Sequence, residues 1–200
     1  MANELLLERS KLFAKYAEKM PKKFDKVDLQ LDYPEFGWID IHFKLNGEEK
    51  ALITASEVYE PFEDIRIWLE EISSYTQAFV AIYDEFDYYY LYYEPLIDVD
   101  LKHNNGPKGL FYIYNRNEKL IVADGIFETR KFVRSLYDSI TTFAKEASQN
   151  KSFVENWIEG AYNSEWGEYE SDDDPRVREI FINKVISQKI ECYLKGKDNK

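Results

Sequence analysis

The sequence has very little cysteine, glycine or proline. Cys192 is the single cysteine among 200 residues, so no disulfide within the chain can stabilise the fold, and an oxidising compartment is not implied. It lies in an expected helix, where a cysteine usually behaves as a small buried apolar residue. Eight glycines and six prolines are too few for a low-complexity chain.

Long apolar runs are also missing. No stretch of 18 apolar residues occurs, so we expect no membrane-spanning helix. The first residues, MANELLLERSKLF, include Glu4 and Glu8 and only a short apolar run, whereas a secretory signal needs a basic start and a longer apolar segment. A cytoplasmic location is therefore the expectation.

Basic residues are scarce in one part of the chain. The net charge is −12, and residues 48–100 contain fourteen acids against Lys50 and Arg66 alone. Residues 1–47 carry eight acids and eight bases, and residues 101–200 carry sixteen of each. This charge excludes a general nucleic-acid binder, which needs a basic surface, and favours a basic partner.

Common catalytic and metal-binding motifs are lacking. The sequence contains no HExxH, HxH, CxxC, GxGxxG, GxxxxGK[ST] or GxSxG pattern. His103 stands in an Asn/Gly-rich loop, and Asp172–Asp174 are best explained as an exposed loop ending in a helix cap before Pro175. We therefore predict no catalytic residue, no metal site and no cofactor.

One alternative with chemistry remains open. His42 lies between Asp40 and Lys44 on the polar face of an expected strand, close to Trp38. A carboxylate beside a histidine can orient a general base. A cleft near Trp38, Asp40 and His42 would make the chain a small-ligand-binding protein or a hydrolase-like enzyme.

Apolar periodicity predicts the elements. Period-2 alternation and turn residues such as Asn46-Gly47 favour strands, and apolar positions at helical spacing favour helices. Strands are expected at 26–33, 38–45, 48–57, 76–83, 88–94, 109–115 and 119–126. Helices are expected at 3–20, 61–73 and 128–148, with a short helix around 153–158 and a final helix from Pro175 to about Leu194.

This order predicts an α+β fold. Three successive hairpins favour one antiparallel, meander-like sheet of about six to seven strands, packed by amphipathic helices and flanked by N- and C-terminal helices. We expect residues 1–150 to form the α+β domain and residues 151–200 to form a helical extension packed on it.

Tyrosine is the most unusual feature of the acidic segment, which holds eight of the sixteen tyrosines. A symmetric turn in the 76–94 hairpin would pair Ile82 with Tyr89 and Val80 with Leu91. The opposite face would then carry Phe79, Tyr83, Tyr88, Tyr90 and Tyr92. Such a row is explained either by ordinary stacking on a sheet or by a protein interface, where tyrosine is enriched.

The order of features resembles a known group of proteins. Acids precede an aromatic helix at Glu57–Ile72 with Pro61 and Trp68, and a later helix begins near Glu128. Over roughly residues 27–148 this pattern is similar to small acidic bacterial immunity proteins of toxin systems and their uncharacterised relatives. The resemblance implies a protein that binds and blocks a toxin and has no catalysis of its own.

The leading hypothesis is a non-enzymatic binding protein, of immunity or inhibitor type, that captures a basic protein partner such as a toxin, without nucleic acid or membrane. The predicted anchors are Tyr88, Tyr90 and Tyr92, and the predicted steering charges are Glu63, Asp64, Glu71, Asp84 and Asp87. A self-associating structural protein, in which the tyrosine row forms a homodimer interface, is the third possibility.

Overall fold

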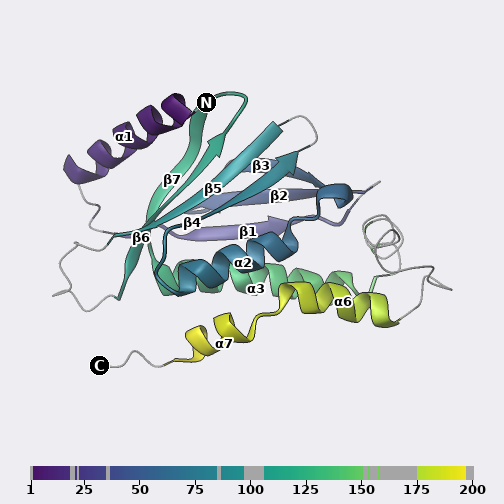
Figure 1. Ribbon diagram of the computed structural model, residues 1–200. Helices are drawn as coiled ribbons and strands as arrows, with labels where there is room; N and C mark the ends of the chain where they lie inside the picture. The colour runs from purple at the N-terminus through teal and green to yellow at the C-terminus, as the bar shows by residue number, and fades with distance from the viewer. Residues whose placement is uncertain are drawn as a thin grey trace.

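The fold is α+β with antiparallel sheets, as predicted (Figure 1). The computed structural model describes residues 2–18, 21, 23–34, 37–84, 87–96, 106–150, 153, 157 and 175–196. The strands are β1 (Val27–Leu31), β2 (Trp38–Leu45), β3 (Glu48–Ser56), β4 (Ala78–Asp84), β5 (Asp87–Pro95), β6 (Lys108–Asn115) and β7 (Leu120–Glu128). The helices are α1 (Ala2–Glu18), the 3-10 turn η1 (Glu57–Tyr59), α2 (Phe62–Ser73), α3 (Thr129–Ala147), α6 (Pro175–Val185) and α7 (Gln188–Lys195).

The hairpins form where turn chemistry predicted them. Asn46 and Gly47 have φ angles of 55° and 85°, the left-handed conformation that a two-residue turn requires, and they join β2 to β3. In the β4–β5 hairpin Ile82 pairs with Tyr89, as predicted. The predicted pairing of Val80 with Leu91 is confirmed as well, so the two faces of this hairpin are those expected from the sequence.

The strands do not form one sheet, and this part of the prediction was wrong. The order is β1-β2-β3 in one antiparallel sheet and β4-β5-β6-β7 in a second. Between β3 and β4 the chain passes through η1 and α2, which interrupts the run of hairpins. The sheets approach each other beside β7, where Asp25 donates its backbone N–H to Ile126 O at 2.9 Å and accepts the Ile126 N–H through Oδ2 at 3.0 Å.

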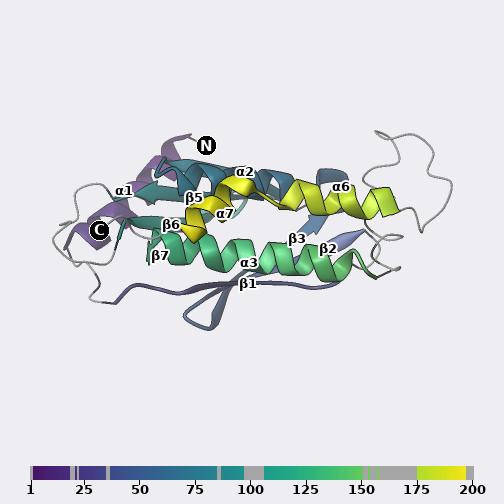
Figure 2. The ribbon, with the colours of Figure 1, turned by 90° about the horizontal axis from the view of Figure 1, so that it is seen from below.

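Both sheets bury one face in a common core. Phe43 of the first sheet lies 6.3 Å from Phe111 of the second, measured between ring centroids. Helices α2, α3, α6 and α7 lie together on one side, and Figure 2 shows this helical layer face-on. Trp68 of α2 and Phe132 of α3 meet edge to face at 5.9 Å within the core. Phe181 of α6 is fully buried in the same cluster.

The C-terminal segment is two helices rather than the single final helix predicted. Ser187 has an extended backbone, with φ −130° and ψ 115°, and its Oγ accepts the Ile190 N–H at 3.2 Å, so it caps the start of α7. Tyr137 of α3 accepts the Ser187 N–H at 2.8 Å. Local capping and this long-range bond together fix the break between α6 and α7.

Helix α1 packs on the other side of the four-stranded sheet (Figure 1). Leu12 joins Leu110, Tyr112 and Ile126 in a small cluster separate from the main core. Strand β6 is therefore buried on both faces, which explains its nearly continuous apolar sequence. None of the helices that the structure describes is long and apolar enough to cross a membrane.

Some residues singled out in the sequence are placed differently from the prediction or lie outside the described residues. Cys192 lies in α7 as expected, but it is exposed rather than buried, because α7 turns Ile190 toward the core. His103 and Asp172–Asp174 lie outside the described residues. Of the short helix expected around 153–158, the structure describes Phe153 and Trp157, both buried in the main core.

Candidate functional site

Strand alternation places a row of aromatic rings on the outer face of the β4–β5 hairpin. Side chains on successive residues point to opposite faces of a strand. Leu91 and Tyr93 therefore enter the main core, whereas Tyr88, Tyr90 and Tyr92 lie on the opposite face. Across the ladder, Tyr83 pairs with Tyr88 and Phe79 with Tyr92 on that same outer face.

The rings form a continuous series. The centroid separations are 4.3 Å for Tyr59 and Tyr83, and 4.7 Å for Tyr83 and Tyr88. They are 6.2 Å for Tyr88 and Tyr90, 6.3 Å for Tyr90 and Tyr92, and 5.6 Å for Phe79 and Tyr92. These values lie in the range of favourable offset and edge-to-face contacts. We call the six residues the aromatic strip: Tyr59, Phe79, Tyr83, Tyr88, Tyr90 and Tyr92.

Helix α1 covers the neighbouring part of the same sheet face and reaches the strip at Tyr92, which packs against the cluster of Leu12 and Tyr112. Tyr112 of β6 stacks on Tyr92 at 5.0 Å but lies under α1 and is buried. Phe79 is 60% exposed and Tyr59 is 54% exposed, while Tyr88 and Tyr90 are partly exposed. The sheet face is thus divided into a covered half over β6–β7 and an open aromatic half over β4–β5.

Two of the predicted steering acids lie at the tip of this hairpin. Asp84 and Asp87 face each other as the last pair of the β4–β5 ladder. Asp87 Oδ1 accepts the backbone N–H groups of Tyr88 at 2.6 Å and Asn117 at 3.1 Å. Asp87 therefore fixes the turn as well as contributing negative charge beside Tyr88.

The other predicted acids lie on α2. This helix packs Trp68 and Leu69 against the core face of the sheet, on the side opposite the strip. Glu63 is in the first turn and is tied to Arg66 at 3.1 Å. Asp64 and Glu71 are exposed. The structure thus brings Tyr88, Tyr90 and Tyr92 together with Asp84 and Asp87, and separates them from Glu71.

Arg66 has a structural role between α2 and the C-terminal segment. It pairs with Glu70 at 2.6 Å and donates its Nε–H to Lys184 O at 2.7 Å. Partial burial raises the pKa of Glu70, but hydrogen bonds from Ser187 and Arg66 outweigh it and lower that pKa overall. The basic residue that the sequence places among the α2 acids is thus used to hold α2 against α6 and α7.

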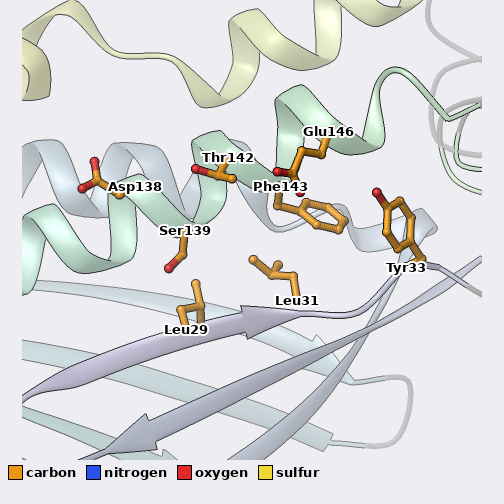
Figure 3. Close-up of a pocket in the computed structure, with 8 residues that line it drawn as sticks. All are labelled: Leu29, Leu31, Tyr33, Asp138, Ser139, Thr142, Phe143 and Glu146. Carbon is orange, nitrogen blue, oxygen red and sulfur yellow. The ribbon is translucent and has the colours of Figure 1, made fainter.

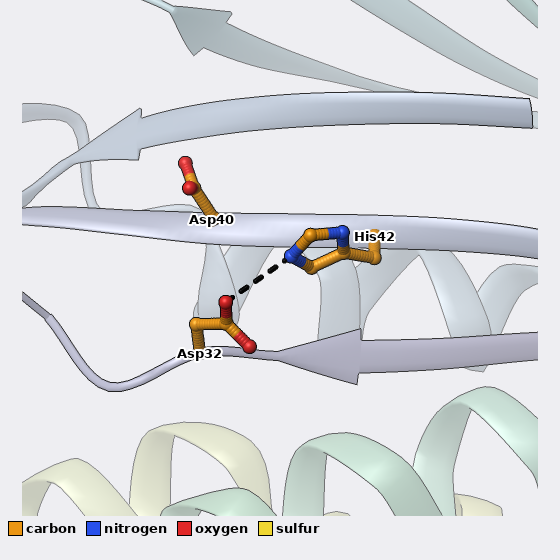
Figure 4. A group of neighbouring side chains, drawn as sticks. All are labelled: Asp32, Asp40 and His42. Atoms are coloured by element: carbon orange, nitrogen blue, oxygen red, sulfur yellow. Dashed lines mark hydrogen bonds and ion pairs between the residues drawn. The ribbon is translucent and has the colours of Figure 1, made fainter. Parts of the chain in front are cut away.

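The alternative site at His42 lies on the outer face of the three-stranded sheet. His42 Nδ1 is 2.7 Å from Glu49 Oε2. His42 Nε2 is 3.3 Å from Asp32 Oδ2, and this contact is drawn in Figure 4. The hydrogen bond to Glu49, together with that to Asp32, raises the pKa of His42 against the opposing effect of partial burial. Asp40 accepts the Thr54 hydroxyl at 2.6 Å, and Trp38 is half-buried on the same strand.

A hollow of about 390 Å³ lies elsewhere, between β1 and α3 (Figure 3). Leu31 and Phe143 form its apolar wall, Tyr33 stands at one end, and Asp138 and Glu146 stand on the α3 side. A second hollow of about 300 Å³ lies between α3 and α7. Neither is lined by His42 or by the aromatic strip, so the chemistry-bearing residues and these hollows do not coincide.

Sequence reasoning missed several members of these groups. Tyr59 and Phe79 are the most exposed rings of the strip, but Tyr59 reaches Tyr83 only through the tertiary fold. Asp32 directly follows β1 and Glu49 lies in β3, on either side of the strand that carries His42, so only the pairing register brings them to it. The expected pairing of the 76–94 hairpin had already placed Phe79, Tyr83, Tyr88, Tyr90 and Tyr92 on one face, so Tyr59 is the member of the strip that sequence reasoning missed.

Comparison of the chain with protein-family models, with curated proteins and with solved structures gave no match. The geometry of the described residues is therefore the basis for a function.

Proposed function

We propose that this chain is a non-enzymatic binding protein that captures a basic protein partner on the aromatic strip. The observation that carries the proposal is the division of one sheet face: α1 covers β6–β7, whereas Phe79 and Tyr59 remain more than half exposed over β4–β5. An apolar, contiguous surface next to a covered one favours an interaction site. Tyrosine contributes large contact area at low entropic cost.

The charge of the chain favours a basic partner. The strip belongs to the segment with fourteen acids and two bases, and Asp84 and Asp87 stand at its tip. Aromatic faces attract guanidinium groups, and one such contact already exists, because Arg116 lies 5.1 Å from the centre of the Tyr88 ring. Arginine side chains of a partner would find a further aromatic face on Phe79, which is 60% exposed.

In this proposal the acidic residues and the aromatic rings contribute to different steps of binding. The acids steer a basic partner toward the protein and speed the encounter. The rings supply most of the affinity, since buried aromatic residues dominate interface energetics. A basic toxin is one partner with this chemistry, in line with the resemblance to immunity proteins.

A fluorescent arginine-rich peptide tests the strip directly. Anisotropy titrations would compare the wild type with Phe79→Ser and Tyr90→Ala, and with Tyr33→Ala, which alters a tyrosine that is 51% exposed outside the strip. We expect the strip variants to weaken binding by about 30-fold, the factor typical of an interface hot spot, and Tyr33→Ala to leave it unchanged.

Repeating the titrations at high salt distinguishes binding at the strip from a general electrostatic attraction. Strip-dependent binding should lose part of its affinity in high salt and keep the difference between wild type and variants. Binding that is equal in Phe79→Ser and in the wild type, and that vanishes in salt, would show a general attraction to a negative protein and overturn the proposal.

A further inference from the structure

The outer face of the three-stranded sheet holds a second constellation that the strip does not use. His42 and Asp40 stand on the same face of β2, two positions apart, and Asp32 follows β1. The Asp32 backbone N–H donates to Asp40 O at 3.0 Å, which holds the two aspartates beside each other. One ligand atom from each of Asp32, Asp40 and His42 lies within 4.8 Å of the other two.

We propose that Asp32, Asp40 and His42 bind a divalent transition-metal ion, zinc in the first instance, through two carboxylates and the Nε2 atom of the imidazole. Imidazole nitrogen with carboxylate oxygen is a ligand set that suits zinc, whereas calcium and magnesium take oxygen ligands. Three protein ligands on an open sheet face leave further coordination positions to water.

The distances fit an ion better than a direct contact. Two ligands of a tetrahedral zinc ion lie about 3.3 Å apart when the bonds are about 2.0 Å long. The separation between His42 Nε2 and Asp32 Oδ2 is 3.3 Å, which is long for a charge-assisted hydrogen bond. The three ligand atoms lie within 4.8 Å of one another, which is the span that one ion would bridge.

Outer partners already orient two of the ligands. A metal-binding histidine almost always gives its other ring N–H to a carboxylate or carbonyl, which fixes the tautomer. Glu49 Oε2 lies 2.7 Å from His42 Nδ1, which directs the Nε2 lone pair toward the aspartates. Thr54 Oγ1, on β3, donates to Asp40 Oδ1 at 2.6 Å and restrains that carboxylate, which leaves Oδ2 as the oxygen for the ion.

The negative charge around His42 also favours the binding of a cation. Asp32, Asp40 and Glu49 surround one imidazole, and among the described residues no lysine or arginine forms an ion pair with any of the three. Lys44, the nearest base along β2, donates to Gln30 at 2.7 Å. Apart from His42 itself, these carboxylates have no basic partner among the described residues, and a divalent ion would neutralise their charge.

Zinc chloride titrated calorimetrically into the full chain tests the site. All proteins carry Cys192→Ser, because this exposed thiol could bind zinc by itself. His42→Gln should abolish the binding, and Asp40→Asn and Thr54→Val should weaken it by about tenfold or more. Asp28→Asn is the matched control, since Asp28 is exposed on the same face of β1 opposite Lys44, and it should bind like the parent.

Two further readouts keep the result independent of folding defects. Cobalt should produce visible absorption bands in the parent and not in His42→Gln. Zinc should raise the thermal midpoint of the parent and of Asp28→Asn but not of His42→Gln, since an ion that binds only the native state stabilises it. Circular dichroism would establish that each variant is folded. Absence of binding by the parent, or equal binding by His42→Gln, would overturn the proposal.

Discussion

Arg9 of α1 and Glu94 of β5 form an ion pair that crosses the boundary between the covered sheet face and its covering helix. Arg9 Nε lies 2.7 Å from Glu94 Oε1, and the Tyr112 hydroxyl donates to the same oxygen at 2.8 Å. The Glu94 side chain is 8% exposed. The pairing with Glu94 raises the pKa of Arg9 against the effect of burial.

Removing the cation from this pair should destabilise the protein measurably. Arg9→Met leaves the buried Glu94 carboxylate with one neutral donor, so we expect a loss of about 2 kcal/mol in urea unfolding. Lys11→Met is the control, because the Lys11–Glu8 pair on the same helix is exposed, and its loss should cost under about 0.5 kcal/mol. Equal losses in both variants would contradict a special role for Arg9.

The backbone of β6 approaches the Tyr93 ring so closely that only glycine fits at position 109. A Cβ atom on Gly109 would overlap the ring, which is fully buried and whose hydroxyl donates to Thr129 Oγ1 at 2.7 Å. Gly109→Ala should therefore cost about 3 kcal/mol of unfolding free energy.

Gly196→Ala provides the comparison for that variant. Gly196 has a φ of −56°, and an added Cβ there would meet its neighbours at ordinary van der Waals distances. Chemical denaturation should show almost no change for Gly196→Ala. A Gly109→Ala protein as stable as the wild type would mean that the Tyr93 ring moves aside readily.

The Ser187 hydroxyl between α6 and α7 should contribute measurably to stability. Ser187→Ala removes the hydroxyl that accepts the Ile190 N–H and also hydrogen-bonds Glu70, so we expect a loss of about 1 kcal/mol or more. Ser74→Ala is the control, since its exposed hydroxyl donates to a carbonyl within α2. Thermal unfolding followed by circular dichroism would measure both, and the idea fails if the midpoints fall together.

Buried phenols should set the alkaline limit of stability. Burial, with the hydrogen bond to Glu94, raises the pKa of Tyr112, and burial raises the pKa of Tyr93. Unfolded tyrosines ionise near pH 10. Because the folded state holds these protons more tightly, their contribution is complete below about pH 10 and is lost as the pH rises further.

Urea midpoints measured across this range would check the sign. We expect a steady midpoint up to about pH 9.5 and a fall beyond about pH 10, with phenolate absorbance rising as the protein unfolds. Tyr112→Phe should make the fall shallower. A midpoint that rises above pH 10 would contradict the direction of the shifts.

Local chemistry made the hairpins predictable, and tertiary contacts decided the rest. The turn at Asn46-Gly47 and the pairing of Ile82 with Tyr89 follow from residues close in sequence. The chain passes through η1 and α2 between β3 and β4, and the strands before and after this segment pair only within their own sheets. No local pattern encodes which hairpins pair with each other, so three hairpins alone suggested one meander.

For the candidate sites too, local sequence patterns predicted neighbours within a hairpin but not contacts between distant elements. Alternation alone indicated that Tyr88, Tyr90 and Tyr92 share a face, and the structure places them together. It could not show that α1 would cover only half of that face, nor that Asp32 and Glu49 would flank His42. Each of these relationships joins elements that the sequence keeps apart.

The separate cluster beneath α1 has a consequence for how the molecule opens. Leu12 and its neighbours contact the outer face of β6 and β7, and among the described residues no side chain of α1 joins the main core. Undocking α1 therefore exposes little of what stabilises the remainder, so this helix forms its own cooperative unit. Its amide hydrogens should exchange with solvent well before those of α3, and each such opening would expose Tyr112, which stacks on Tyr92 of the aromatic strip.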